Sequence, residues 1–245
     1  MVWTECAPFR RATAPWVHAF SERGDPDDPL DFGSSGAETS TQRDARRRLR
    51  LALELPAGRL AMPCQVHGAR IVEAGPSSEA ARADGVISRD AAWAPTVRTA
   101  DCVPLLLVAP AADVAAAVHA GWRGVASRIV PEAVRALAAR GADRSRIYAA
   151  IGPSIGACCY AVSRTVAEVL RGAVDGRGLR GGGPDGSVDL RLAVERHLLR
   201  AGLRESRIWR SDACTRCDGD RWYSHRREGG VAGRQAAVVG RPLND

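Results

Sequence analysis

The hydrophobic pattern of the chain is dominated by two apolar runs near its middle. Residues 102–108 read Cys-Val-Pro-Leu-Leu-Leu-Val, and residues 114–119 read Val-Ala-Ala-Ala-Val-His. Continuous apolar runs of this length are typical of strands that are buried on both faces. We therefore predict two core strands, followed by a helix that starts at the Gly121–Gly124 turn and runs to about Arg140.

Shorter patterns predict further strands and helices on both sides of these runs. Strands are expected at 68–73, 85–88, 147–151 and 208–210. Helices are expected from about 41 to 55, from 163 to 174 and from 189 to 200, and loops at 22–45 and 175–187. The chain has no internal repeat and no linker that would divide it. We therefore predict one mixed α+β domain over residues 1–245, an ordinary length for a single domain.

The positive net charge of the chain comes entirely from arginine. The formal net charge is +7, and all 35 basic residues are arginine. Together with the abundant alanine and glycine, this bias indicates a genome-wide compositional preference rather than a surface selected for nucleic acid. We therefore expect no nucleic-acid partner. Some of the arginine can still serve a small anion such as phosphate, because a planar guanidinium binds its oxygens in pairs.

Cysteine content and the N-terminal sequence predict a soluble cytoplasmic protein. Seven cysteines is an odd number, and their spacing is not that of a secreted disulfide framework. Residues 1–5 lack the build of a signal peptide, and no apolar run approaches the roughly 18–20 residues that span a bilayer. We expect reduced thiols, some of them metal-bound, and no membrane partner. The sequence leaves open whether the protein is a monomer or a homodimer.

Three residues in short glycine-containing or small-residue motifs form a candidate metal site. His67 lies in Gln-Val-His-Gly, Cys102 in Thr-Ala-Asp-Cys, and His119 in Val-His-Ala-Gly-Trp-Arg-Gly. Two imidazoles and one thiolate suit zinc, and three protein ligands leave a fourth position open, as in catalytic zinc sites. Because Cys102 begins one predicted core strand and His119 ends the next, adjacent strands would bring them together. An ion there could polarise a bound group or lower the pKa of a bound water towards ~7.

Further motifs extend this pattern over most of the chain. They are His-Ala-Phe-Ser-Glu-Arg at 18–23, Ala-Asp-Gly-Val at 83–86, Gly-Pro-Ser-Ile-Gly at 152–156, Cys-Cys-Tyr at 158–160, Tyr-Ser-His-Arg-Arg at 223–227 and Gly-Arg-Gln at 233–235. In this order the motifs resemble the laccase-domain family, now regarded as purine nucleoside phosphorylases and formerly described as multicopper polyphenol oxidases. The resemblance implies a cysteine-hydrolase-like α-β-β-α sandwich, with zinc on His67, Cys102 and His119. It also implies phosphorolysis of adenosine, guanosine and inosine to free base and ribose 1-phosphate, with adenosine deamination as a second activity.

Phosphorolysis needs cations that hold phosphate beside the ribose and stabilise charge as the glycosidic bond loosens. The candidate substrate-binding residues are Arg23, Asp31, Arg46, Arg123, Ser224, Arg226 and Arg234. Arg123 could instead be a surface arginine stacked on Trp122. Asp101 is a candidate catalytic residue that orients a ligating imidazole, or it caps a turn.

The chain departs from the family pattern at three positions. Asp31 stands where asparagine is usual, Ala161 where glutamate is common, and His225 where tyrosine is usual. If Asp31 faced the substrate, its negative charge would disfavour phosphate. The changes leave the metal ligands intact, but they weaken the expectation that a particular purine nucleoside is phosphorolysed.

Other functions stay open on the residues alone. Cys102 and His119 could be the nucleophile and base of an amide hydrolase. A copper oxidase of phenols fits less well than a zinc enzyme, because one centre with two histidines and one cysteine is not a trinuclear copper cluster with an electron-entry site. A metal-stabilised binding module that has lost catalysis is the remaining alternative.

Cys214 and Cys217 have the Cys-x-x-Cys spacing of redox and zinc motifs. No second pair stands at zinc-ribbon spacing, because Cys158 and Cys159 are adjacent. We therefore expect Cys217 to be incidental, and Cys158 and Cys159 to pack near the site rather than react.

Overall fold

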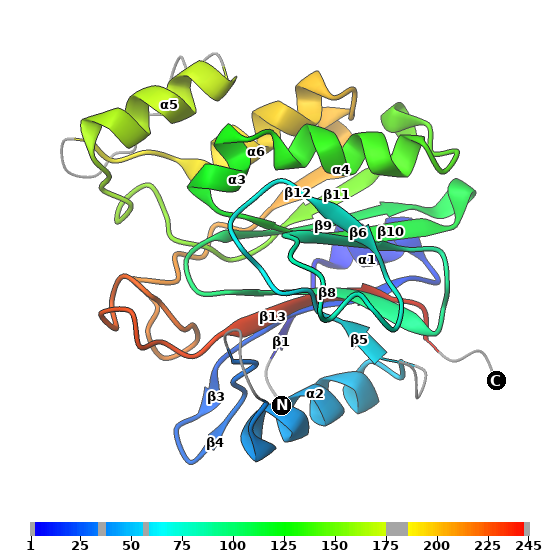
Figure 1. The fold of residues 1–245 in the computed structure, drawn as a ribbon, viewed down its shortest axis with the longest axis horizontal. Helices are drawn as coiled ribbons and strands as arrows, with labels where there is room; N and C mark the ends of the chain where they lie inside the picture. The colour runs from blue at the N-terminus through cyan, green and yellow to red at the C-terminus, as the bar shows by residue number, and fades with distance from the viewer. Residues whose placement is uncertain (1–2, 34–37, 56–58, 175–185, 243–245) are drawn as a thin grey trace.

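Two stacked β-sheets with helices on their outer faces make up the molecule (Figure 1). The computed structural model describes residues 3–33, 38–55, 59–174 and 186–242. The five-stranded sheet has the order β1 (Trp3–Thr4), β2 (Val17–Ser21), β13 (Gln235–Gly240), β8 (Trp93–Thr99), β5 (Arg59–Ala61). The six-stranded sheet has the order β12 (Ile208–Arg210), β11 (Tyr148–Ile151), β9 (Val103–Ala109), β10 (Val114–Ala120), β7 (Gly85–Ser88), β6 (Ile71–Glu73). A small third sheet pairs β3 (Gly24–Asp25) with β4 (Asp28–Pro29).

Helices flank the two large sheets. The α-helices of the described ranges are α1 (Ala7–Thr13), α2 (Ser40–Ala52), α3 (Trp122–Ala126), α4 (Ile129–Ala138), α5 (Arg164–Val174) and α6 (Leu190–Arg200). In Figure 1, α3, α4 and α6 lie over the six-stranded sheet, and α2 lies beyond the five-stranded sheet on the opposite side. Within the described part of the chain, no helix combines the length and apolar character that a membrane span requires.

The apolar run of β9 is continuous because both of its faces are covered. Leu105 and Leu107 belong to the core that includes residues of α4 and α6. Leu106 and Val108 point the other way, into the core between the two sheets, where they meet residues such as Val97 of β8. These four residues of β9 are fully buried. The sequence pattern of a strand buried on both faces therefore has a direct structural cause.

The predicted mixed α+β fold is confirmed by the structure and by its solved relatives described below. The strands β6, β7, β9, β10, β11 and β12 and the helices α2, α5 and α6 fall within a few residues of their predicted positions. The helix predicted to run from Gly121 to about Arg140 is wrong in its continuity. It is broken into α3 and α4 because Arg128 adopts the left-handed conformation, with φ of 66°.

One predicted loop differs from the expectation, and another lies almost entirely outside the described residues. The segment predicted as a loop at 22–45 contains the β3–β4 hairpin and the first turn of α2, which Thr39 caps by accepting the backbone N–H of Gln42. Of the glycine-rich loop predicted at 175–187, residues 175–185 lie outside the described residues.

Candidate active site

The antiparallel pairing of β9 and β10 sets the centre of the site. His119, near the end of β10, is opposite Pro104, and Cys102 lies just before β9 begins. His67 approaches from the loop before β6, in the left-handed conformation with φ of 61°. The ligand atoms of His67, Cys102 and His119 lie within 4.8 Å of one another, so the group could hold a metal ion. The sequence prediction that adjacent strands bring Cys102 and His119 together is confirmed.

Two glycines of the His-Ala-Gly-Trp-Arg-Gly motif allow these residues to approach. A Cβ atom at Gly121 would lie 3.0 Å from Cys102 Sγ and 3.1 Å from a ring carbon of His67. A Cβ atom at Gly124 would lie 2.9 Å from the carbonyl oxygen of Gly68. All three distances are shorter than ordinary van der Waals contacts, so glycine at both positions lets the loop that carries His67 approach closely.

Asp84 is the buried carboxylate that holds the two histidines. Its Oδ1 accepts hydrogen bonds from the His119 Nδ1–H and the His67 backbone N–H, both at 2.8 Å. Its Oδ2 accepts the backbone N–H groups of Val66 at 3.2 Å and Gly68 at 2.6 Å. With Nδ1 occupied, His119 presents Nε2 to the centre of the site, as an imidazole ligand held by a carboxylate does. Burial opposes the ionisation of Asp84, but the hydrogen bond from His119 and those from the backbone outweigh it and lower its pKa.

The electrostatics favour a deprotonated Cys102. Burial acts to raise the pKa of this thiol, but the charge of His119 and hydrogen bonds from both histidines lower it to about 6. Conversely, burial acts to lower the pKa of His119, and the Cys102 thiolate and Asp84 raise it to about 9. Without metal these shifts favour a thiolate–imidazolium pair, and the thiolate is the form that binds metals and acts as a nucleophile.

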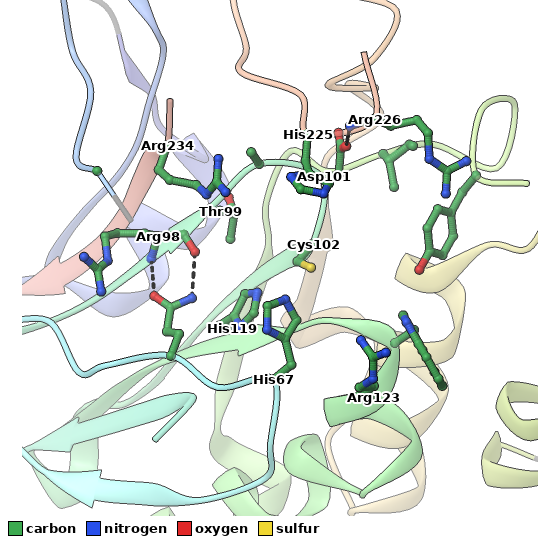
Figure 2. A pocket seen from close by; sticks show the side chains of 16 residues that line it. His67, Arg98, Thr99, Asp101, Cys102, His119, Arg123, His225, Arg226 and Arg234 are labelled. Carbon is green, nitrogen blue, oxygen red and sulfur yellow. Dashed lines mark hydrogen bonds between the residues drawn. The ribbon is translucent and has the colours of Figure 1, made fainter. Parts of the chain in front are cut away.

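A pocket of about 460 Å³ opens over this group, a volume within the range typical of small-molecule sites. Its lining residues are Gly33, Gln65, His67, Arg98, Thr99, Ala100, Asp101, Cys102, His119, Trp122, Arg123, Ile155, Tyr160, His225, Arg226 and Arg234. Figure 2 shows Arg98 and Arg234 on one side of the His67–Cys102–His119 group and Arg123 and Arg226 on the other. The pocket therefore joins a metal-ligand set to a strongly cationic lining.

Seven of the residues predicted from sequence line this pocket. They are His67, Asp101, Cys102, His119, Arg123, Arg226 and Arg234. Arg123 lies over the Trp122 ring, with its Cζ 4.6 Å from the ring centroid, and makes no hydrogen bond to any described residue. The Cζ of Arg226 lies 5.6 Å from the Tyr160 ring centroid, and the Arg226 guanidinium donates to the carbonyl of Ala161 at 2.9 Å. Arg234 donates to the carbonyls of Ala232 and Gly233.

Four other predicted residues are not among the described residues that line the pocket. Arg23 donates to the Gly219 carbonyl at 2.8 Å, and Arg46 pairs with Glu38 at 2.7 Å. Asp31 accepts the backbone N–H of Arg234 at 2.8 Å, so it supports a pocket arginine rather than facing the pocket itself. Ser224 is fully buried, and its hydroxyl accepts the backbone N–H of Arg227 at 3.2 Å.

Of the two roles considered for Asp101, orienting a ligating imidazole does not match the structure, because its carboxylate contacts other residues. Its Oδ1 accepts the hydroxyl of Thr215 at 2.7 Å, and its Oδ2 accepts the backbone N–H of Arg226 at 2.6 Å. Asp101 itself is in the left-handed region, with φ of 86°, directly before Cys102. Asp84 is the residue that orients the His119 imidazole, because the 83–86 motif places it beside β10. Asp101 instead contacts the loop that carries Thr215.

Comparison with known proteins identifies the family. Residues 27–242 match the family described as multi-copper polyphenol oxidoreductase laccase. The chain belongs to this family. It is 35% identical to purine nucleoside phosphorylase YlmD of Geobacillus stearothermophilus over 98% of this chain and 94% of that protein. It is 34% identical to adenosine deaminase RL5, from an unknown prokaryotic organism, over 78% of each chain. The crystal structure of the Geobacillus YlmD superposes with a TM-score of 0.89, covering 99% of this chain and 97% of that one at 32% identity.

Several lining residues of this laccase-family chain were not predicted as site residues. Gln65 and Thr99 lie within the motifs of His67 and Cys102, and His225 is one of the three departures from the family pattern. Arg98 and Tyr160 also line the pocket, and Arg98 donates to the Pro63 carbonyl at 3.0 Å. The signal that could have found Gln65 and Thr99 is their place beside metal-ligand candidates. Arg98 carries no such signal, because it lies on β8, a strand that the sequence pattern did not predict.

Proposed function

We propose that this chain is a zinc-dependent purine nucleoside phosphorylase that converts adenosine, inosine and guanosine to free base and ribose 1-phosphate. We also propose that the same site deaminates adenosine. The observation that carries the proposal is the pocket of about 460 Å³ in which the His67–Cys102–His119 group faces four arginines. The names of two family relatives, a purine nucleoside phosphorylase and an adenosine deaminase, support both activities. On this proposal the substrates are a nucleoside and phosphate.

The donor set fits zinc. Two imidazole nitrogens and one thiolate within 4.8 Å of one another match the ligand types and spacing of a catalytic zinc site. Asp84 fixes His119 with Nε2 free, and Cys102 favours the thiolate. His67, Cys102 and His119 would hold the ion, which would supply a Lewis acid at the floor of the pocket. Copper is less suitable, because this single three-residue centre does not provide a trinuclear cluster.

The arginines give the pocket the charge that phosphate requires. In phosphorolysis a phosphate oxygen bonds to ribose C1′ while the bond from C1′ to N9 breaks and its electron pair leaves with the base. Arg123 is the best placed to bind phosphate, because its guanidinium has no hydrogen-bond partner among the described residues and is held only by the Trp122 ring. A phosphate held there would form charge-assisted hydrogen bonds of the strong type.

The walls of the pocket offer contacts for the nucleoside. Thr99 lines the pocket, and its buried hydroxyl has no hydrogen-bond partner among the described residues. Trp122 and Tyr160 supply aromatic surface on the side of Arg123 and Arg226. These features support a ligand with both a flat ring and polar groups, which is the chemistry of a nucleoside. We also propose that residues 1–245 form a single domain with a cysteine-hydrolase-like α-β-β-α sandwich fold.

The test is product analysis with zinc-loaded protein. Adenosine, inosine and guanosine are incubated with and without phosphate, and products are identified by mass spectrometry. Free base with ribose 1-phosphate, formed only with phosphate, is expected, together with some inosine from adenosine in both buffers. The Cys102→Ser variant is the matched control and should form neither product. If the zinc-loaded protein leaves all three nucleosides unchanged, the proposal is wrong.

A Cys–His amide hydrolase is the second candidate, favoured by the thiolate–imidazolium pair of Cys102 and His119. The two candidates differ in the accessibility of the thiolate in metal-loaded protein. A zinc-bound thiolate is shielded from alkylation, whereas a catalytic nucleophile reacts. Peptide mapping after treatment with iodoacetamide should therefore find Cys102 unlabelled with zinc and labelled after chelation. Labelling in both states would favour the hydrolase.

A further inference from the structure

Four cysteines outside the pocket converge at one end of the six-stranded sheet. Cys158 and Cys159 lie in the turn after β11, and Cys214 and Cys217 lie in the loop after β12. Because β11 and β12 are parallel neighbours, the loops that leave their carboxyl ends emerge at the same edge of the sheet. The four Sγ atoms lie within 4.8 Å of one another. Parallel pairing therefore brings together two cysteine pairs more than 50 residues apart along the chain.

Hydrophobic packing does not account for this cluster. Free cysteine is among the most buried residue types. Cys158 and Cys217 are exposed, and Cys159 and Cys214 are only partly buried. Cys217 therefore belongs to a four-thiol group, contrary to the expectation that it is incidental. Cys158 and Cys159 belong to the same group and directly precede Tyr160, which lines the pocket.

The spacing of the sulfur atoms suits one tetrahedral ion. With zinc–sulfur bonds of about 2.3 Å, the sulfur atoms of a regular tetrahedron lie about 3.8 Å apart. The Sγ of Cys217 lies 3.7 Å from that of Cys158 and 3.4 Å from that of Cys159. A cluster of several iron atoms would hold its four thiolates further apart than a single ion does. The geometry therefore indicates a mononuclear site.

The backbone around the cluster is arranged for thiolates. The N–H of Gly156 donates to Cys214 Sγ at 3.1 Å, and a Cβ atom at Gly156 would lie 3.1 Å from Cys158 Sγ. Burial acts to raise the pKa of Cys214, but this hydrogen bond and others from the backbone lower it to about 7. The neighbouring thiols raise the pKa of Cys217. The backbone therefore places an N–H donor beside one of the four sulfur atoms, and Gly156 leaves room for the others to approach.

We propose that Cys158, Cys159, Cys214 and Cys217 bind one zinc ion as a tetrathiolate site. Four protein ligands close the coordination sphere, which is the arrangement of a structural rather than a catalytic zinc site. The ion would join the turn after β11 to the loop after β12. Neither loop has a long stretch of regular structure to hold it, so the metal would supply the cross-link.

The loop that the proposed zinc would hold also reaches the active site. Thr215 lies between Cys214 and Cys217, and its hydroxyl donates to Asp101 at 2.7 Å. The backbone N–H of Thr215 donates to the Ser154 carbonyl at 3.1 Å. Tyr160, next to Cys159, lines the pocket. The structural ion would therefore fix one wall of the pocket without contacting the substrate.

X-ray absorption spectroscopy at the zinc edge tests the site directly. The protein used is the full-length Cys102→Ser variant, reduced, loaded with zinc and freed of excess metal. This variant lacks the only thiolate of the active-site group and keeps all four clustered cysteines. We expect about one tightly bound zinc per chain with four sulfur neighbours at about 2.3 Å. The result does not depend on enzymatic activity, so it stands apart from the proposed function.

Two further variants complete the test. Adding Cys214→Ser and Cys217→Ser to Cys102→Ser should remove the four-sulfur signal and the tightly bound zinc. Adding Cys64→Ser instead is the matched control and should change neither, because Cys64 lies outside both cysteine-containing groups. The proposal is overturned if the Cys102→Ser protein binds no zinc or binds iron in preference. It is equally overturned by a mixed nitrogen and sulfur shell, or by mass-spectrometric detection of a disulfide within the cluster under reducing purification.

Discussion

Asp84→Asn is the perturbation that most sharply tests the architecture of the active site. Each carboxylate oxygen of Asp84 accepts two hydrogen bonds: Oδ1 from His67 and His119, and Oδ2 from Val66 and Gly68. An asparagine NH₂ group placed at either oxygen would face two N–H donors. If it replaced Oδ1, His119 could keep a hydrogen bond only by moving its proton to Nε2, the nitrogen that the metal needs.

The expected magnitude follows from this count. Asp84 is fully buried, so two donors left unpaired would cost roughly 1–3 kcal/mol each, or about 2–6 kcal/mol of unfolding free energy in total. Loss of a carboxylate that holds a metal-ligating histidine typically lowers metal affinity by about 10–100-fold. We therefore expect Asp84→Asn to be measurably less stable and to bind zinc about 10–100-fold more weakly.

The assay measures competition for zinc between the protein and a chelating dye. The protein also carries Cys214→Ser and Cys217→Ser, which leave only two cysteines in the four-cysteine group, so that zinc binding at the active site is measured. Urea unfolding of metal-free protein measures the stability separately. Asp101→Asn is the control, since Asp101 contacts Thr215 and Arg226 but no ligating imidazole. The reasoning is refuted if Asp84→Asn keeps its zinc affinity within twofold, or if Asp101→Asn loses as much.

Three other outcomes are expected. Arg123→Ala should raise the KM for phosphate about tenfold, because the Arg123 guanidinium can form charge-assisted hydrogen bonds to phosphate. Folding should be unchanged, because the guanidinium contacts only the Trp122 ring. Steady-state kinetics at varied phosphate concentration measures the effect. His18 is buried and its pKa is lowered by burial to about 4, so the unfolded chain binds the extra proton as the pH falls below about 6.5. Urea unfolding should show wild-type stability falling by about 2 kcal/mol more than that of His18→Gln between pH 7.5 and 5. Gly152→Ala would place a Cβ against the Phe20 ring and should lower the free energy of unfolding by about 1–3 kcal/mol, measured by urea unfolding. Gly172→Ala is the control, because its Cβ would meet open space on α5, and it should raise the free energy of unfolding by about 0.5–1 kcal/mol.

The six-stranded sheet could be predicted from sequence because its strands carry strong local signals. The apolar runs of β9 and β10 are buried on both faces, and the motifs at their ends placed Cys102 and His119 together. The five-stranded sheet lacks such signals. β13 pairs with β2, more than 200 residues earlier, and with β8, whose sequence includes Pro95 and Arg98. Pairing of this kind is decided by tertiary contacts rather than by local pattern.

The candidate site residues also differ in how strongly the local sequence indicates them. His67, Cys102 and His119 could be predicted from their ligand chemistry together with the family resemblance, since few combinations of such side chains suit a catalytic metal. Arginines were harder, because arginine supplies every basic charge in this chain and its occurrence alone does not distinguish a pocket residue from a surface ion pair. Arg46, for example, forms an ion pair with Glu38 outside the pocket. Only the three-dimensional structure distinguishes such a surface arginine from one that lines the pocket.

The two cysteine-containing groups show how the number of protein ligands divides the chemistry between them. The group of Cys102 offers three ligands beneath a pocket and leaves room for a substrate, whereas the group of Cys214 offers four and leaves none. They are linked by one short path, in which Thr215 donates to Asp101, the residue before Cys102. Asp101 has a left-handed backbone, a conformation that costs energy for residues other than glycine and must be held by its neighbours. A closed metal site beside Thr215 would supply that rigidity, so the four clustered cysteines would serve catalysis by fixing the backbone that presents Cys102.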